Sequence, residues 1–200
     1  MSLFDKEVIE INNLTVVNFF GGPGSGKSTG AAYVFSKLKM MGVNCEIVTE
    51  YAKDKTWEKT TKVFENQLYI FGKQYFKIYR LQGEVDLAIT DSPLPFSIVY
   101  NKNPHLGESF ERLVFDVFNT YNNINFFINR TKHYSEVGRW ETLDEAIKVD
   151  NKIIKTLENN NIDYCSIFGD EDGYDQAIEI ILGKNDLYDI KDIRSHERPR

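Results

Sequence analysis

Cysteine is scarce in this sequence, which contains only Cys45 and Cys165. The two lie far apart in the chain, without the spacing of a metal site, and each falls in a short apolar run that we expect to be a buried strand. This scarcity excludes a disulfide framework and a cysteine-rich metal site. It favours two reduced core thiols in a cytoplasmic protein.

Long hydrophobic runs are missing as well, since no stretch approaches the ~18 consecutive apolar residues of a membrane helix. The first residues, MSLFDKEVIE, are acidic and poor in apolar side chains. We therefore expect neither a signal peptide nor a membrane span.

Positive charge is in deficit, with 24 Lys and Arg against 30 Asp and Glu and a net charge of -6. A phosphate-rich polymer would be repelled by the chain as a whole and could dock only on a local basic patch. Nucleic acid is thus a less favoured partner than a small molecule.

Internal repeats and low-complexity blocks are also absent, and short β-branched runs alternate with longer amphipathic stretches. This alternation is typical of βαβ units around a parallel sheet. A chain of 200 residues with 42% hydrophobic content supports one core. We predict a single three-layer α/β domain over residues 1–183 and a polar tail over 184–200. The expected strands are Leu14–Phe20, Asn44–Thr49, Asp86–Thr90, Asn123–Ile128 and Asp163–Phe168.

Apolar residues at helical spacing predict helices between these strands. The start of the fourth helix is the sharpest, because Thr142 and Glu145 have the spacing of a capping box. The expected helices are Lys27–Met41, Thr61–Gln82, Leu106–Tyr121, one that follows Thr142 and ends at Asn159–Asn161, and one near Tyr174–Leu182.

The segment GGPGSGKS, residues 21–28, fits the phosphate-binding pattern G-x-x-x-x-G-K-[ST] between an expected strand and an expected helix. Glycines let the backbone wrap phosphate oxygens, Lys27 bridges the terminal phosphates and Ser28 can ligate Mg²⁺. The alternative is a glycine-rich turn that carries GKS by chance. The residues predicted to bind ATP are Gly22, Pro23, Gly24, Ser25, Gly26, Lys27, Ser28 and Thr29.

Two further strands are predicted to end in acids at the same edge of the sheet. Asp91 follows the run LAIT and is the candidate second metal ligand, or else it caps the turn made with Ser92. Glu50 could accept a proton from an acceptor hydroxyl, or it is a solvated acid at a strand end. Motor-type P-loop ATPases usually carry a water-activating Glu where this chain has Ser92, which favours transfer to an acceptor over hydrolysis.

A polar loop after the fourth strand is the candidate lid. Arg130 or Arg139 could fold over the transferred phosphoryl group and stabilise its charge. The alternative is a surface loop with solvated charges. Asp150, in the following helix, either tethers a lid cation or lies at the edge of the apolar stripe.

The sequence resembles the P-loop kinase-like ATPases related to the ribosylnicotinamide kinase domain of bacterial NadR proteins, a group with many small phage-encoded members. The resembling segments are GGPGSGKST, VTEYAKD at 48–54, ENQLYIFGKQ at 65–74, VDLAITDSPL at 85–94 and NINFFINRTKHYSEVGRWETLDEAIKVD at 123–150. The resemblance implies a lid, ATP and Mg²⁺, phosphorylation of a nucleoside or nucleotide, and, for a phage-encoded member, a place in the host cytoplasm. No adenylyltransferase domain accompanies the segments, so we do not expect a role in NAD salvage.

The residues thus predict a small-molecule kinase with catalytic Lys27, Glu50, Asp91, Arg130 and Arg139, and with Ser28 and Asp91 at the metal. One rival is a nucleotide-dependent switch or accessory ATPase that acts through protein partners. A second rival is a kinase of nucleic-acid ends or of modified bases in DNA. Its basic groove would use Lys53, Lys55, Lys59, Lys62 and Arg80.

Overall fold

A sheet of five parallel strands lies at the centre of the computed structural model, which describes residues 14–57, 61–131 and 142–183. The strand order is β2-β3-β1-β4-β5. All five strands fall where the sequence predicts them, so the parallel α/β sheet is confirmed. The strands are β1 (Thr15–Phe20), β2 (Cys45–Val48), β3 (Leu87–Thr90), β4 (Asn122–Asn129) and β5 (Cys165–Phe168).

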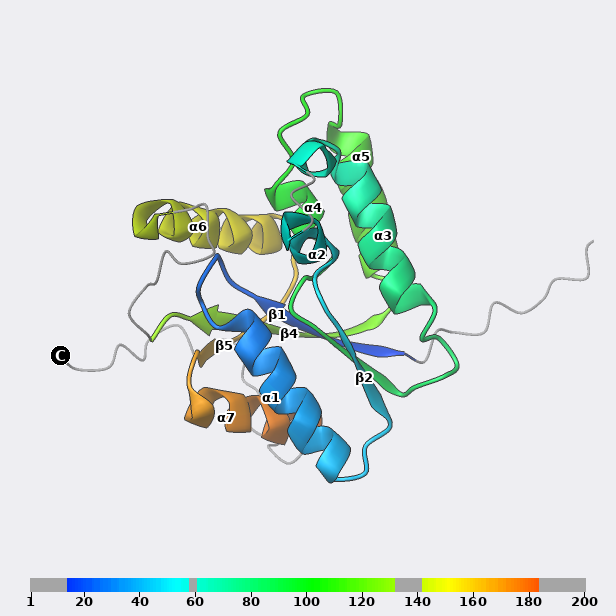
Figure 1. Cartoon of the computed structure of the whole chain (residues 1–200), viewed down its shortest axis with the longest axis vertical. Coiled ribbons are helices and arrows are strands. Elements are labelled where there is room, and N and C mark those ends of the chain that lie inside the picture. Colours follow the sequence, from blue (N-terminus) through cyan, green and yellow to red (C-terminus); the bar gives the residue numbers. More distant parts are fainter. Residues whose placement is uncertain (1–13, 58–60, 132–141, 184–200) are drawn as a thin grey trace, which may run out of the picture.

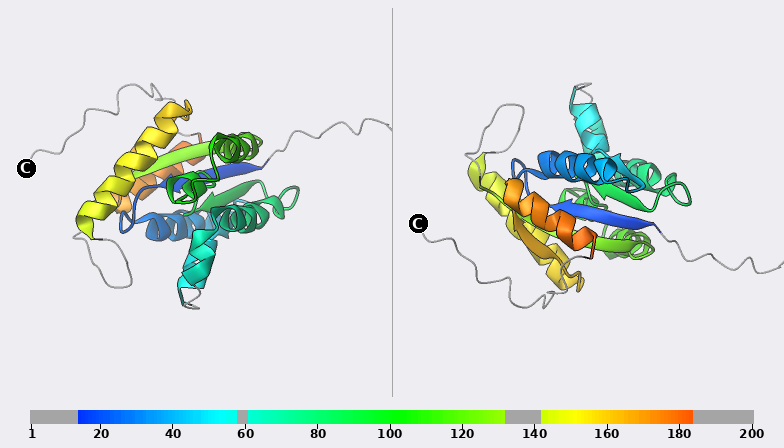
Figure 2. Two further views of the ribbon diagram at one scale, coloured as in Figure 1. Left: turned by 90° about the horizontal axis from the view of Figure 1, so that it is seen from above. Right: turned by 90° about the horizontal axis from the view of Figure 1, so that it is seen from below.

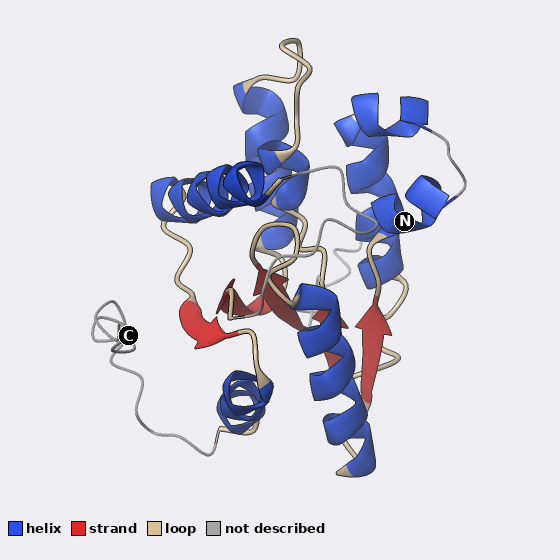
Figure 3. Ribbon diagram, turned by 60° about the vertical axis from the view of Figure 1, so that its left-hand side comes forward, coloured by secondary structure: helices blue, strands red, loops and turns tan. Residues whose placement is uncertain are grey.

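Helices cover both faces of the sheet and complete three layers (Figures 1 and 3). They are α1 (Lys27–Met40), α2 (Tyr51–Trp57), the 3-10 turn η1 (Thr61–Glu65), α3 (Gln67–Tyr79), α4 (Phe96–Val99), α5 (Glu108–Phe118), α6 (Leu143–Asn159) and α7 (Glu171–Ile181). Helices α1 and α7 pack side by side on one face (Figure 2), while α3, α4, α5 and α6 cover the other.

Two hydrophobic cores flank the sheet, and the middle strand β1 supplies both. Phe19 and Phe20 are consecutive and fully buried, and they point to opposite faces because side chains alternate along a strand. Phe19 packs in the core under α1 and α7 and stacks on Phe126 at a centroid distance of 5.5 Å. Phe20 packs under α3 to α6, edge-on to Phe96 at 5.7 Å. This double burial holds the end of β1 in place, directly before the predicted phosphate loop.

The single helix predicted over Thr61–Gln82 is wrong, because Asn66 divides this segment. Its side chain accepts a hydrogen bond from the Tyr69 backbone at 3.1 Å and caps α3, so the preceding turn remains the separate η1. Capping also moves the last helix, which begins three residues before Tyr174 because Asp170 accepts from the Gly173 backbone at 3.1 Å. The helix predicted over Leu106–Tyr121 is shorter as well.

The predicted capping box at Thr142 and Glu145 is confirmed in full. The Thr142 side chain accepts from the Glu145 backbone, and the Glu145 carboxylate accepts from the Thr142 backbone at 2.8 Å. These bonds hold the pKa of Glu145 below its usual value. The box fixes the first residue of α6 and therefore the turn of that helix that faces the phosphate loop.

Both cysteines are free thiols, with Cys45 buried in β2 and Cys165 half-buried in β5. Burial raises the pKa of Cys165 to about 11. In the part of the chain that the structure describes, no helix is long and apolar enough to cross a membrane. The predicted tail, residues 184–200, lies outside the described residues.

Candidate active site

The phosphate loop connects β1 to α1, with Lys27 as the first residue of the helix. Gly26 caps the helix at a φ of 107°, a conformation that side-chain-bearing residues rarely adopt. A β-carbon at Gly26 would also lie 2.5 Å from the hydroxyl of Tyr174, which donates a hydrogen bond to the Gly26 carbonyl at 3.1 Å. Residue 26 therefore has to be glycine. Helix α7 packs against the loop through Tyr174.

The Lys27 ammonium lies over the loop, where it donates to the Gly22 carbonyl at 2.9 Å. It also sits 5.5 Å from the centroid of the Phe96 ring. Desolvation in this half-buried position is the largest influence on Lys27 and lowers its pKa below the ordinary 10.5. The Lys27 ammonium is therefore poorly hydrated, and a poorly hydrated cation is well suited to bind a multiply charged anion.

Three carboxylates converge on Lys27 from different elements. Glu50, Asp91 and Asp150 each oppose the lowering of the Lys27 pKa through their charge, whereas Arg130 adds to it. Glu50 follows β2, Asp91 follows β3 and Arg130 follows β4, whereas Asp150 belongs to α6. Residues that the sequence predicts to act together therefore act on the same ammonium.

The loop also offers unused donors for an anion. The Ser25 hydroxyl is buried and has no hydrogen-bond partner among the described residues, while Ser28 and Thr29 are exposed on the first turn of α1. The backbone N–H groups of that turn have no partner within the helix, because the first turn of any helix lacks them. A triphosphate fits this arrangement of donors.

Magnesium also fits the donors at this edge of the sheet. No group of three or more His, Cys, Asp or Glu side chains that could hold a metal occurs within residues 14–57, 61–131 and 142–183. Mg²⁺ in phosphate-transferring sites is usually bound through one or two protein oxygens and the substrate phosphates. Ser28 and Asp91, the predicted pair, could supply those oxygens.

Asp91 and Glu50 are joined directly. The backbone N–H of Glu50 donates to the Asp91 carboxylate at 3.1 Å, so the ends of β2 and β3 are tied together. Asp91 is 6% exposed, while the N–H of the following Ser92 bonds to the Thr90 hydroxyl at 3.1 Å. One Asp91 oxygen thus bonds across the sheet edge to the chain after β2.

Arg130 and Asp150 form an ion pair beside the loop. Nη1 of Arg130 lies 2.7 Å from Oδ2 of Asp150, and its Nη2 donates to the Pro23 carbonyl at 3.0 Å. The other Asp150 oxygen accepts from the Gly22 backbone at 2.5 Å. Of the two alternatives for Asp150, the structure therefore shows the tether, and the tethered cation is Arg130.

Gly22 is the point where α6 meets the phosphate loop. A β-carbon there would lie 2.7 Å from the Ala146 carbonyl and 2.7 Å from the Asp150 carboxylate. Sequence reasoning placed Gly22 in the loop but missed this contact, because the loop motif carries no information about which helix packs on it.

Gln74 is a site residue that the sequence analysis missed. It is buried in α3, where its side chain accepts from the Tyr51 backbone at 3.0 Å and donates to the Thr90 hydroxyl at 3.5 Å. Thr90 in turn donates to the Val48 carbonyl at 2.9 Å. This buried polar chain fixes α3 against the edge that carries Glu50. The only signal in the sequence was a polar residue in an apolar stripe.

Arg139 and most of the predicted lid, residues 132–141, lie outside the described residues. Arg130 and Thr131 are the part of that loop that the structure shows, and Thr131 donates to the Gly169 carbonyl at 3.1 Å.

The parallel sheet, the glycine loop after its middle strand and the acids at neighbouring strand ends define an α/β P-loop protein with the kinase fold. The chain belongs to the AAA domain family, whose sequence profile matches residues 16–172.

Two solved structures share this fold. The chain is similar to thymidylate kinase from Ehrlichia chaffeensis, with 15% identity, a TM-score of 0.51, and coverage of 86% of this chain and 97% of that one. It is also similar to deoxyadenosine kinase from M. mycoides with bound dATP, with 16% identity, a TM-score of 0.50, and coverage of 84% and 98%. A comparison with curated proteins gives no match. At these identities the likeness concerns the fold.

Proposed function

We propose that this protein transfers the terminal phosphoryl group of ATP to a nucleoside or nucleotide. The observation that carries the proposal is the bond from the Glu50 backbone to the Asp91 carboxylate, which joins two acidic strand ends whose charges both act on the Lys27 ammonium. This arrangement sets a phosphate-binding cation beside two carboxylates at the carboxyl ends of parallel strands, where open α/β sheets bind their ligands.

The donor would be held by the loop from Gly22 to Thr29. Lys27 is poised to leave the Gly22 carbonyl for phosphate oxygens, because an anion is a stronger acceptor for an ammonium than a neutral carbonyl is. Ser28 and Asp91 would hold Mg²⁺, which when bound neutralises charge on the phosphates.

The acceptor would lie on the side of Glu50. A carboxylate in this place can orient a hydroxyl and take up its proton. Glu50 follows β2 and is half-buried, whereas Asp91 is almost wholly buried and already accepts a backbone N–H. We therefore assign the base to Glu50 and the metal to Asp91.

Transfer is favoured over hydrolysis by the residue after Asp91. That residue is Ser92, which is buried and whose backbone N–H donates to the Thr90 hydroxyl. A hydroxyl cannot serve as the general base that a hydrolytic P-loop enzyme needs, since its pKa lies far above neutrality. This argues against the rival function as a hydrolysing switch.

Arg130 has a supporting part in the proposal. Its guanidinium is engaged by Asp150 and the Pro23 carbonyl, so it positions the phosphate loop. Arg139 remains the proposed lid arginine. The relation to the NadR kinase domain, the single domain over residues 1–183 and a cytoplasmic location belong to the same proposal.

The test is a screen of nucleosides, their monophosphates and ribosylnicotinamide with ATP labelled at the terminal phosphate. We expect labelled product with at least one acceptor, and none with Lys27→Ala under the same conditions. ADP formation that needs no acceptor and is unchanged by every compound would support the switch instead.

A further inference from the structure

The sequence segment that contains α2, η1 and α3 differs in charge from the rest of the protein. Residues 51–80 contain seven Lys and Arg against three Asp and Glu, which leaves 17 against 27 for the remaining chain. Helix α3 contains no acidic residue at all, although it carries Lys73 and Lys77. A positive region therefore lies within an otherwise acidic protein.

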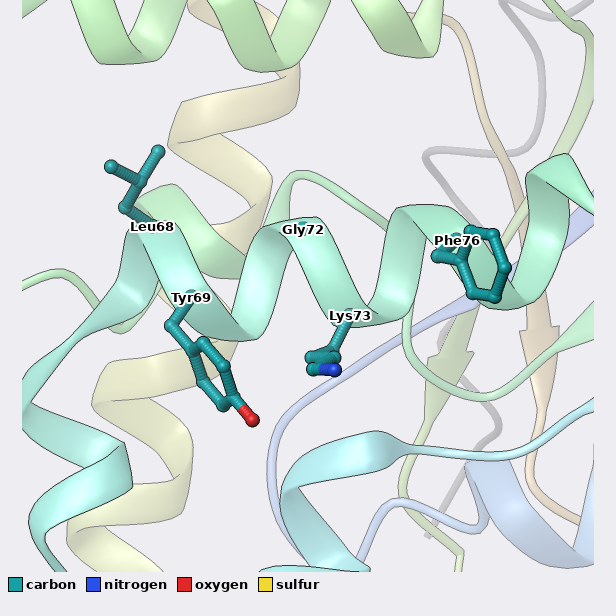
Figure 4. A pocket seen from close by; sticks show the side chains of 5 residues that line it. All are labelled: Leu68, Tyr69, Gly72, Lys73 and Phe76. Atoms are coloured by element: carbon teal, nitrogen blue, oxygen red, sulfur yellow. The ribbon is translucent and has the colours of Figure 1, made fainter.

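Large apolar side chains are exposed on the same helix. Leu68 is 46%, Tyr69 43% and Phe76 60% exposed to solvent. Together with Gly72 and Lys73 they line an open groove of about 380 Å³ along α3 (Figure 4). Gly72 has no side chain and leaves the middle of the groove open, since no atom lies within 4 Å of the position that its β-carbon would take.

Rings and ammonium groups alternate on this surface. Lys73 lies 5.4 Å from the centroid of the Tyr69 ring, and Lys55 lies 5.5 Å from that of Tyr51. The two tyrosine hydroxyls are 3.1 Å apart, which joins α2 to α3. Tyr51 directly follows Glu50. The aromatic-basic strip, defined here as Tyr51, Lys55, Tyr69, Lys73 and Phe76, thus includes the residue next to Glu50 and continues along α3.

We propose that the aromatic-basic strip binds single-stranded nucleic acid. Exposed rings stack on unpaired bases, and neighbouring lysines contact the phosphates between them, which is the chemistry of sequence-tolerant single-strand binding. A duplex hides the faces of its bases and would leave Tyr69 and Phe76 unused. An acidic peptide would satisfy Lys55 and Lys73 but would also leave the rings in water.

This binding goes beyond the proposed phosphoryl transfer and needs neither ATP nor an acceptor hydroxyl. The acidic remainder of the chain repels the same polyanion, which confines the strand to this surface.

The test is fluorescence anisotropy of a labelled oligothymidylate titrated with the full chain in the absence of ATP. We expect Tyr69→Ala and Phe76→Ala each to weaken binding by roughly 5-fold to 100-fold, the range measured for the loss of one stacked base. Lys73→Ala should weaken it less and lower the salt dependence, with a slope smaller by about 0.7.

Lys39→Ala is the matched control. Lys39 is also exposed and also lies over an aromatic ring, 5.8 Å from the centroid of Phe35, but it belongs to α1 on the opposite face of the sheet. Its replacement should change the affinity less than twofold. Lys27→Ala should likewise bind the strand normally, which separates this proposal from the kinase proposal.

Several outcomes would overturn the proposal. These are no binding at low salt, equal binding of a duplex of the same length, or displacement by polyglutamate as readily as by unlabelled oligothymidylate. Concentration-dependent dimers in sedimentation velocity that Phe76→Ala abolishes would show instead that a second copy of the chain covers this face. Each variant is checked by thermal unfolding, and since these side chains are exposed, melting temperatures should stay close to that of the unmodified protein.

Discussion

Arg130 and Asp150 are 20 positions apart in sequence, yet their side chains form an ion pair of 2.7 Å. Each also bonds to one of two consecutive loop residues, Arg130 to the Pro23 carbonyl and Asp150 to the Gly22 N–H. Helix α6, the chain after β4 and the phosphate loop are therefore fastened at one place. Because both side chains are mostly buried, the pair is shielded from the water that weakens surface ion pairs.

Asp150→Asn tests this fastening. The amide oxygen can still accept from Gly22, but the charge that balances Arg130 is lost. We expect the free energy of unfolding to fall by about 1–3 kcal/mol, measured by urea denaturation, because a buried charged donor loses its partner. Asp116→Asn, an exposed acid on α5, is the control and should lie within about 0.5 kcal/mol of the unmodified protein.

A double-mutant cycle with Arg130→Met then isolates the pair. If the two side chains act as a unit, the second replacement should cost much less than the first, with a coupling energy of about 0.5–3 kcal/mol. Additive losses would show that the ion pair contributes nothing of its own.

Gly22→Ala tests how closely α6 approaches the loop. The added methyl group would lie 2.7 Å from both the Ala146 carbonyl and the Asp150 carboxylate, so the helix or the loop has to shift. We expect a loss of stability of about 1–3 kcal/mol and weaker ATP binding in calorimetry. Gly72→Ala in α3 meets open space and should raise stability by about 0.5–1 kcal/mol. Normal ATP affinity in Gly22→Ala would mean that this contact does not shape the loop.

The lowered pKa of Lys27 predicts how the free energy of unfolding varies with pH. Its folded-state pKa is lowered by burial, so between that value and the ordinary 10.5 the unfolded chain binds more protons than the folded one. The free energy of unfolding contributed by Lys27 therefore rises with pH across this window. Urea denaturation of the unmodified protein and of Lys27→Met, compared at several alkaline pH values, measures that contribution. A difference that stays constant with pH would contradict the assigned desolvation.

Activity should respond in the opposite sense. The ammonium form of Lys27 binds phosphate, so kcat/KM for ATP, which reports the groups of the free enzyme, should decline as pH rises through the lowered pKa, below 10.5. Asp150→Asn removes a charge that supports the ammonium and should move this decline to lower pH. An unchanged pH profile in that variant would contradict the electrostatic link.

The phosphate loop and the sheet could be predicted because their signals are local. The GKS motif identifies the phosphate loop, and continuous apolar runs predict strands that are covered on both faces. The spacing of Thr142 and Glu145 predicts the start of a helix. The acids after β2 and β3 followed from the rule that parallel strands end at one edge.

What the sequence could not predict depends on contacts between distant segments. Gln74 is a polar residue within an apolar stripe, and its role becomes clear only from its bonds to the Tyr51 backbone and the Thr90 hydroxyl. Helices α2 and α4 are 7 and 4 residues long, too short for a periodic pattern to identify them. The division at Asn66 depends on a cap that competes with a helix of otherwise good periodicity.

The most direct test of the proposed kinase site is Glu50→Gln, with the transfer rate and the ATP dissociation constant measured on the same sample. If Glu50 orients the acceptor hydroxyl, the rate should fall by about 100-fold or more, the usual contribution of a general base, while ATP affinity changes less than threefold. An equal loss of rate and of ATP affinity, or no loss of rate, would contradict the assignment of Glu50 to the acceptor and with it the proposed site.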